Sequence, residues 1–239
     1  MLAIAADPGD SRINWVEQTV NAAAQLCFLI GIIIIWYASD YYIAGDEAKE
    51  CLNGTETADF GLLFDGSGTE SALVFYPGGK VEYTAYAPLM LTLAEDGIDC
   101  FLCEMPYNLA VFGINTAQKA MNSYSYDKWY VGGHSLGGAM AAVYAENRSD
   151  ISGFVLLGAY PTSAPNCPAL MVYGTCDGVV NRQKLEKGLA MENVTGFVIE
   201  GGNHAGFGCY GAQAGDGEAE LSSEEQWDIT EKAVREFIL

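Results

Sequence analysis

The residue most suited to covalent chemistry is Ser135, at the centre of the pattern Gly-x-Ser-x-Gly over residues 133–137. The strand-like run DKWYVGG precedes it and the helix-like run LGGAMAAVYAENR follows it. A sharp turn between a strand and a helix lifts a serine hydroxyl above the sheet, and glycines two positions away on either side relieve crowding. Ser135 is therefore the candidate nucleophile.

A serine hydroxyl is a weak nucleophile and needs a histidine base that a carboxylate orients. The chain has only two histidines. His134 adjoins the serine in the turn, so its side chain should point elsewhere and its expected role is that of a packed, hydrogen-bonded residue. His204 stands just after the strand-like run TGFVIEGG and is the candidate base.

The acid should lie between the serine and the histidine in chain order. Asp177 follows the run ALMVYG, at the carboxyl end of an expected strand, where α/β sheets place ligands and catalytic groups. Its competitors are Glu200, inside its strand, and Asp150, in an earlier connection. The reaction also needs amide donors for a developing oxyanion, and we expect them from Leu136 and, in FYPGGKVEY, from Gly79.

Five stretches together resemble one known family: FYPGGKVEYTAYAPL, MPYNLAVF, GGHSLGGAMAA, YGTCDGVV and IEGGNHAGFGCYG. They are similar to the alpha/beta hydrolase superfamily, in particular to the group called alpha/beta hydrolase fold-5, which is related in build to dienelactone hydrolases. The likeness covers roughly residues 60–239, and the apolar N-terminal segment looks like that of membrane-attached members.

This resemblance implies an α/β-hydrolase fold with a hydrolytic triad of Ser135, Asp177 and His204. It implies no substrate, because the superfamily includes esterases, lipases, thioesterases, peptidases and dehalogenases. A serine stands where dienelactone hydrolase uses a cysteine, so that lactone activity is not carried over.

From residue 60 onward strand-like and helix-like runs alternate, which is typical of a mostly parallel sheet flanked by helices. Only PTSAPNCP separates the run ending at Tyr160 from the next strand, so we expect no cap domain. An open, shallow site of this kind favours small esters. The loop 203–221 is long enough to need a functional or disorder explanation.

The stretch 18–39 carries no charged residue and, as a helix, is long enough to cross the hydrocarbon layer. A buried core helix is the alternative, but residues 26–38 show no polar stripe. Trp36 and Tyr42 occupy places where a cleavable signal peptide needs small residues, which favours an uncleaved signal anchor. The expected organisation is therefore an N-terminal tail (1–17), a transmembrane signal anchor (18–39), a linker (40–59) and the hydrolase domain (60–239).

Charge and composition limit the partners. Lys and Arg number 11 against 31 Asp and Glu, a net charge of -20, which disfavours nucleic acid as a partner. The same charge repels anionic substrates unless a local cluster intervenes, so a neutral or cationic small molecule fits better. Arg12 is the only basic residue before the apolar stretch and favours an inside N terminus, with the hydrolase domain extracytoplasmic.

The sequence predicts no cofactor. Two histidines exclude a three-histidine metal site, and the seven cysteines are too scattered for paired zinc-binding knuckles. Three functions are compatible with these features: a membrane-anchored serine hydrolase, foremost a carboxylesterase; an acyltransferase or thioesterase with the same triad; and a membrane-tethered binding protein on a hydrolase scaffold. The first is favoured, and the oligomeric state stays open.

Overall fold

The structure, a computed structural model, describes residues 11–68 and 70–239, and the chain divides into two units at Asp40. The described part of the first unit is one helix, α1 (Ser11–Ser39). Its segment Asn14–Ile35 has a mean hydropathy of 1.9 and is long and apolar enough to cross a membrane. The helix begins before the expected boundary at residue 18, since no glycine or proline interrupts residues 11–17. Residues 1–10 of the expected tail lie outside the described residues.

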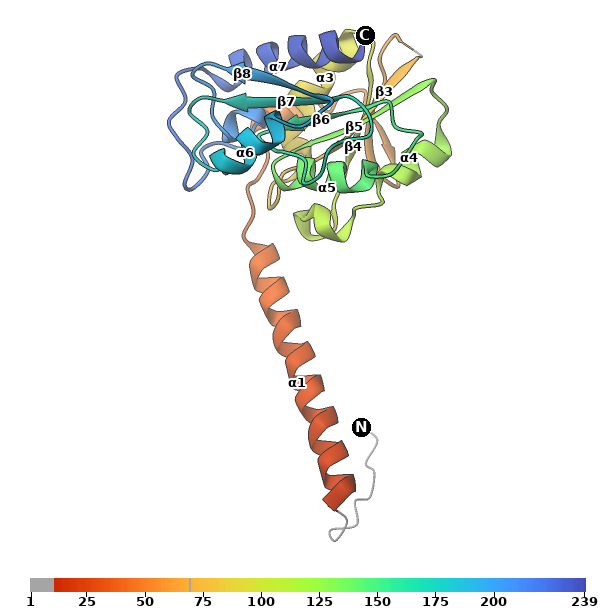
Figure 1. Cartoon of the computed structure of the whole chain (residues 1–239), viewed down its shortest axis with the longest axis vertical. Helices are drawn as coiled ribbons and strands as arrows, with labels where there is room; N and C mark the ends of the chain where they lie inside the picture. Colours follow the sequence, from red (N-terminus) through yellow and green to blue (C-terminus); the bar gives the residue numbers. More distant parts are fainter. Residues whose placement is uncertain (1–10, 69) are drawn as a thin grey trace. The chain divides into compact units, whose positions relative to one another are not determined.

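The second unit, Tyr41–Leu239, is built on one eight-stranded sheet with the order β1-β2-β4-β3-β5-β6-β7-β8 (Figure 1). The strands from β4 across to β8 run parallel, whereas β1 and β2 are antiparallel at one edge. The strands are β1 (Glu56–Ala58), β2 (Gly61–Phe64), β3 (Ser71–Tyr76), β4 (Asp99–Cys103), β5 (Lys128–His134), β6 (Gly153–Leu157), β7 (Ala169–Gly174) and β8 (Val194–Ile199). The expected mostly parallel sheet is thereby confirmed.

Helices cover both faces of this sheet (Figure 1). They are α2 (Asp46–Glu50), α3 (Ala87–Glu95), α4 (Ala117–Ser123), α5 (Leu136–Ala145), α6 (Arg182–Leu189) and α7 (Ser223–Ile238). Leu73 and Phe75 of β3 share a buried cluster with residues of α3 and α7, whereas Val74 between them shares another with residues of α4, α5 and α6. Successive side chains of a strand point to opposite faces, so a strand buried on both faces is apolar throughout.

One expected helix is much shorter in the structure. The sequence predicts a helix over 108–124, but only Ala117–Ser123 is α-helical. Pro106–Asn108 and Ala110–Phe112 are single 3₁₀ turns. Gly113 accounts for the difference, because a glycine inside a helix costs about 1 kcal/mol relative to alanine.

The expected linker 40–59 is packed against the domain rather than extended away from it. It contains α2 and β1, and β1 pairs with β2. Ala44 and Ala48 are buried in the same core as α3. These small apolar residues bury one side of an otherwise acidic segment and so fix its position on the domain.

Candidate active site

Ser135 stands in a strained turn between β5 and α5. Its backbone has φ 51° and ψ -120°, a conformation that a residue other than glycine adopts only at a cost of about 1–3 kcal/mol. A Cβ on Gly133 would lie 2.5 Å from the Tyr76 carbonyl oxygen, and one on Gly137 would collide with the carbonyl oxygens of Tyr76 and Pro77. Both positions therefore require glycine, because the turn packs directly on the end of β3.

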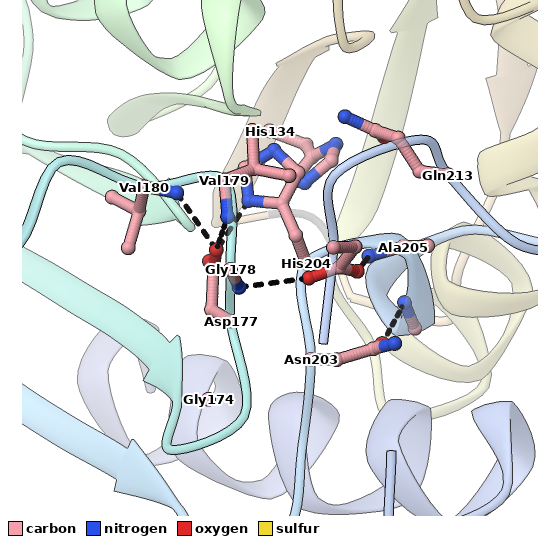
Figure 2. A network of polar contacts seen from close by, with 12 residues as sticks. His134, Gly174, Asp177, Gly178, Val179, Val180, Asn203, His204, Ala205 and Gln213 are labelled. Atoms are coloured by element: carbon pink, nitrogen blue, oxygen red, sulfur yellow. Dashed lines mark hydrogen bonds and ion pairs between the residues drawn. The ribbon is translucent and has the colours of Figure 1, made fainter. Parts of the chain in front are cut away.

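Asp177 follows the carboxyl end of β7, and both of its carboxylate oxygens are hydrogen-bonded (Figure 2). Oδ1 accepts from the backbone N–H groups of Val179, at 2.9 Å, and Val180, at 2.8 Å. Oδ2 lies 2.8 Å from His204 Nδ1. Burial opposes ionisation, but the hydrogen bond and charge of His204 and the two amides together hold the pKa of Asp177 below its usual value. The carboxylate is therefore ionised at neutral pH and fixes a proton on His204 Nδ1.

His204 is buried, and its Nε2 atom has no hydrogen-bond partner among the described residues. Because Nδ1 is engaged by Asp177, Nε2 is the ring nitrogen left to exchange a proton with a neighbouring group. Ser135 and His204 line the same pocket. The Nε2 atom can thus accept a proton there, although its bond to the serine hydroxyl has still to form, as is common before substrate binds.

The competing acids lie elsewhere. Asp150 forms an exposed ion pair with Arg148. Glu200 follows β8 and is exposed. Of the three acids considered from the sequence, the structure brings only Asp177 to the candidate base.

The two residues expected to supply the amide donors, Gly79 and Leu136, pack against each other. A Cβ on Gly79 would lie 2.8 Å from the Leu136 side chain, so the loop after β3 packs against the first residue of α5. The N–H of Leu136 belongs to the first turn of a helix, where amides have no partner within the helix. The N–H of Gly79 makes no hydrogen bond to another described residue.

His134 joins this loop to the turn that carries Ser135. Its Nδ1 lies 2.7 Å from the Tyr86 hydroxyl, which accepts from the N–H of Gly78 at 3.0 Å. The Tyr86 hydroxyl therefore bridges His134 Nδ1 and the Gly78 amide. Burial and, second, the neighbouring His204 lower the pKa of His134 well below its usual value, so it is neutral at neutral pH. It is packed and hydrogen-bonded as expected, but it does not point away from the candidate site, because its ring lies 4.4 Å from that of His204.

Asp216 is a functional candidate that sequence reasoning missed. Its carboxylate accepts from the N–H groups of Gly178, at 2.9 Å, and Ala205, at 2.7 Å. Gly178 directly follows Asp177 and Ala205 directly follows His204, so the Asp216 side chain connects the turn that carries the candidate acid to the turn that carries the candidate base. Asp216 lies in the long loop 203–221, and its place between two glycines is the signal that the sequence offered.

The pocket beside Ser135 has a volume of about 320 Å³. Its walls come from the turn that carries Ser135, from the segment after β6, from the turn after Asp177 and from His204. The lining residues are Ser135, Leu136, Ala139, Gly158, Ala159, Tyr160, Thr162, Val179, Val180, Asn181 and His204. These side chains are mostly small and apolar. Within the described residues, no group of three His, Cys, Asp or Glu side chains lies close enough to hold a metal ion.

Gly158 lies against the Asp177–His204 pair, and there is no space for a side chain at this position. Its φ is +53°, and a Cβ there would lie 2.9 Å from His204 Nδ1 and 3.3 Å from Asp177 Oδ2. We expect Gly158→Ala to displace the imidazole and lower kcat/KM for an ester at least 100-fold, since a misplacement of about 1 Å costs that much. Gly54→Ala is the matched control, because Gly54 also has a positive φ, +88°, but open space around it. Equal activity of the two variants in a hydrolysis assay would contradict this role for Gly158.

Tyr42 connects the two loops that flank the site. Its N–H donates to the Lys80 carbonyl at 2.7 Å, beside the loop that carries Gly79. Its hydroxyl accepts from the Ala214 N–H at 3.1 Å, and its ring lies 5.4 Å from that of Tyr210, both on the loop after His204. Tyr42 thus holds the two loops in register from within the second unit.

We expect Tyr42→Ala to lower both the melting temperature and kcat/KM. An aromatic pair and a hydrogen bond together contribute about 2 kcal/mol, which corresponds to a decrease in Tm of roughly 4–8 °C in a domain of this size. Tyr41→Ala is the control, since Tyr41 is exposed. Calorimetry and an esterase assay on both variants check this, and a Tyr42→Ala protein with unchanged Tm and activity would refute the bracing role.

Comparisons with known proteins identify the family and the fold. The model of a family described as the alpha/beta hydrolase family matches residues 72–228, as the motifs led us to expect. A search of curated proteins found no match.

Similar solved structures include TT1662 from Thermus thermophilus, with 16% identity over 75% of this chain and 97% of that one and a TM-score of 0.52. Est1E from Butyrivibrio proteoclasticus has 14% identity over 77% and 96% of the chains, with a TM-score of 0.54. A soluble variant of monoglyceride lipase from Saccharomyces cerevisiae has 12% identity over 77% and 94%, with a TM-score of 0.55. At these identities the likeness shows a shared fold.

Proposed function

Because the chain belongs to the alpha/beta hydrolase family, we propose that it is a serine hydrolase that cleaves an ester-type acyl bond through Ser135, His204 and Asp177. The observation that carries the proposal is the buried contact of 2.8 Å between Asp177 and His204. His204 lines the same pocket as Ser135, and its Nε2 has no hydrogen-bond partner among the described residues. The strained backbone of Ser135 supports the same role, since such strain is typical of the nucleophile turn.

In the proposed reaction the Ser135 hydroxyl attacks the carbonyl carbon of the ester while His204 Nε2 takes its proton. The negative oxygen of the tetrahedral intermediate accepts hydrogen bonds from the N–H groups of Leu136 and Gly79. His204 then gives the proton to the leaving alcohol, and an acyl-enzyme remains. Water then attacks the acyl carbon while His204 takes one of its protons; the bond to Ser135 breaks, the carboxylic acid leaves, and Ser135 recovers its proton from His204. Asp177 stabilises the imidazolium each time it forms.

The pocket favours a small substrate. It has a volume of about 320 Å³, at the low end of the roughly 300–1,000 Å³ of small-molecule sites. The connection between β6 and β7, residues 158–168, is too short to carry a cap. We therefore propose a carboxylesterase for short acyl groups.

A panel of 4-nitrophenyl esters of graded acyl length tests this function in the full chain. We expect acyl groups of two to four carbons to be hydrolysed faster than those of eight or more, because the pocket beside Ser135 is small and the short β6–β7 connection forms no cap over a longer chain. Added alcohol separates hydrolysis from acyl transfer by the products formed. A protein that hydrolyses none of these esters would contradict the proposal.

We also propose that α1 is a single-pass signal anchor that attaches the hydrolase domain to a membrane, with that domain extracytoplasmic. The apolar segment Asn14–Ile35 supports the anchor, and Arg12 on its N-terminal side supports the orientation. In bacterial expression, an alkaline phosphatase fused after Leu239 should be active, since this reporter folds only outside the cytoplasm. An inactive fusion at equal abundance would indicate the opposite orientation, with the hydrolase domain on the cytoplasmic side.

A further inference from the structure

The helix α6 carries an unusual share of the positive charge of this acidic protein. Arg182, Lys184 and Lys187 lie within six residues, out of 11 Lys and Arg in a chain of net charge -20. Residues three apart on a helix lie on the same side, so Lys184 and Lys187 are neighbours in space. This is the kind of local cluster that can reverse the general repulsion of anions.

The three cations have different surroundings. The guanidinium of Arg182 donates to the carbonyl oxygens of Gly174, Thr175 and Asp177, so it holds the turn that carries Asp177 in place. Lys184 and Lys187 are exposed, and neither forms an ion pair with another described residue. Two ammonium groups are therefore available to a ligand.

Both lysines line a hollow that adjoins the pocket of Ser135. This hollow has a volume of about 250 Å³ and is lined by Tyr160, Pro161, Thr162, Lys184, Lys187 and Met191. Tyr160 and Thr162 also line the pocket of Ser135, and the Lys184 ammonium lies 6.0 Å from the centre of the Tyr160 ring. None of the described residues that line either space is an Asp or a Glu.

We propose that Lys184 and Lys187 bind an anionic group of the substrate, and that the preferred substrates are small acyl esters that carry a phosphate monoester. This inference rests on the proposed esterase function. A phosphate monoester carries a charge of about -1.5 to -2 at pH 7, which matches two ammonium groups better than a carboxylate does. The net charge of -20 disfavours anions over the protein as a whole, so a local pair of exposed ammonium groups is a favourable place for an anion to bind.

The test compares esters that differ in one charge-bearing group. 1-Butyrylglycerol 3-phosphate and 1-butyrylglycerol form one pair, and the 4-nitrophenyl esters of succinic and butyric acid form a second pair with a carboxylate on the acyl side. The variant is Lys184→Glu/Lys187→Glu in the full chain. The control is Lys128→Glu/Lys232→Glu, which makes the same change in net charge; Lys128 begins β5, roughly 20 Å along the strand from Ser135.

We expect the wild type to prefer the phosphate-bearing ester over its neutral partner, with a smaller preference for the succinate ester. Lys184→Glu/Lys187→Glu should lower kcat/KM for the phosphate-bearing ester about tenfold and change the neutral ester less than about twofold. The control variant should keep the wild-type preference, and 0.5 M NaCl should weaken that preference because salt screens exposed charges.

Two results would overturn the inference: an equal loss on charged and neutral esters, or the same loss of preference in the control variant. A wild type that hydrolyses neutral esters without any preference would also overturn it while leaving the esterase function intact. If the wild type hydrolyses no ester and a fluorophosphonate does not label Ser135, it is the proposed function that fails.

Discussion

Replacing Ser135 with alanine should lower kcat for ester hydrolysis by roughly 10⁵- to 10⁶-fold, close to the loss caused by removing a whole triad. The proposed reaction passes through a bond between the Ser135 oxygen and the acyl carbon, and alanine has no atom that can form it. The remaining oxyanion donors and the pocket would still bind the ester, so KM should change little. Initial rates at saturating 4-nitrophenyl butyrate measure the effect.

Ser163→Ala is the matched control for this substitution. Ser163 is exposed, and its hydroxyl donates to Glu146 rather than to the candidate site. Both variants should melt within about 2 °C of the wild type, since each removes one hydroxyl group. Activity retained in Ser135→Ala, or lost equally in Ser163→Ala, would remove Ser135 from the mechanism.

Replacing Asp177 with asparagine should lower kcat by roughly 10³- to 10⁴-fold while the fold persists. An asparagine amide that still accepts from Val179 and Val180 would present its NH₂ group to His204. The imidazole would then carry its proton on Nε2, where the base must be unprotonated. The loss should therefore appear in kcat and not in KM.

Two other acids give the controls, Asp150→Asn and Glu200→Gln. Asp150 pairs with Arg148 at the surface and Glu200 is exposed, so both variants should keep nearly full activity. If either lost as much activity as Asp177→Asn, the assignment of the acid would be wrong.

The pKa of Asp177 gives this variant a second readout. A carboxylate whose pKa is lowered in the folded state stabilises the fold above its unfolded pKa, here near 3.8, and that contribution is lost as the pH falls through the folded value. Asp177→Asn lacks the contribution. We expect its free energy of unfolding to be lower than that of the wild type at pH 7 and the difference to shrink only as the pH falls below 3.8.

Much of the fold could be predicted because the relevant signals are local. The apolar runs that become β3, β6 and β7 are almost entirely buried, so they show the continuous hydrophobicity of central parallel strands. The helix α7 begins where its sequence signal lies: Ser222 and Glu225 form a reciprocal capping box. The packing of the segment 40–59 could not be predicted, because it depends on contacts with residues distant in the sequence, which no local pattern records.

The candidate site likewise has residues that could be predicted from the sequence and residues that could not. Ser135, Asp177 and His204 follow strand ends, and the carboxyl ends of parallel strands lie at one edge of the sheet, so their meeting could be inferred from chain order. The roles of Asp216, Gly158 and Tyr42 could not. They depend on loops that approach one another only in the folded domain, through contacts between residues up to 172 positions apart.

The most direct test of the central claim is covalent labelling with a fluorophosphonate. The probe reacts only with an activated serine, which attacks phosphorus as fluoride leaves. We expect one adduct per folded wild-type chain, located at Ser135 by peptide mass spectrometry, and no adduct in Ser135→Ala or after unfolding. A folded wild-type protein that stays unlabelled, or that is labelled at another serine, would contradict the assignment of Ser135 as the nucleophile.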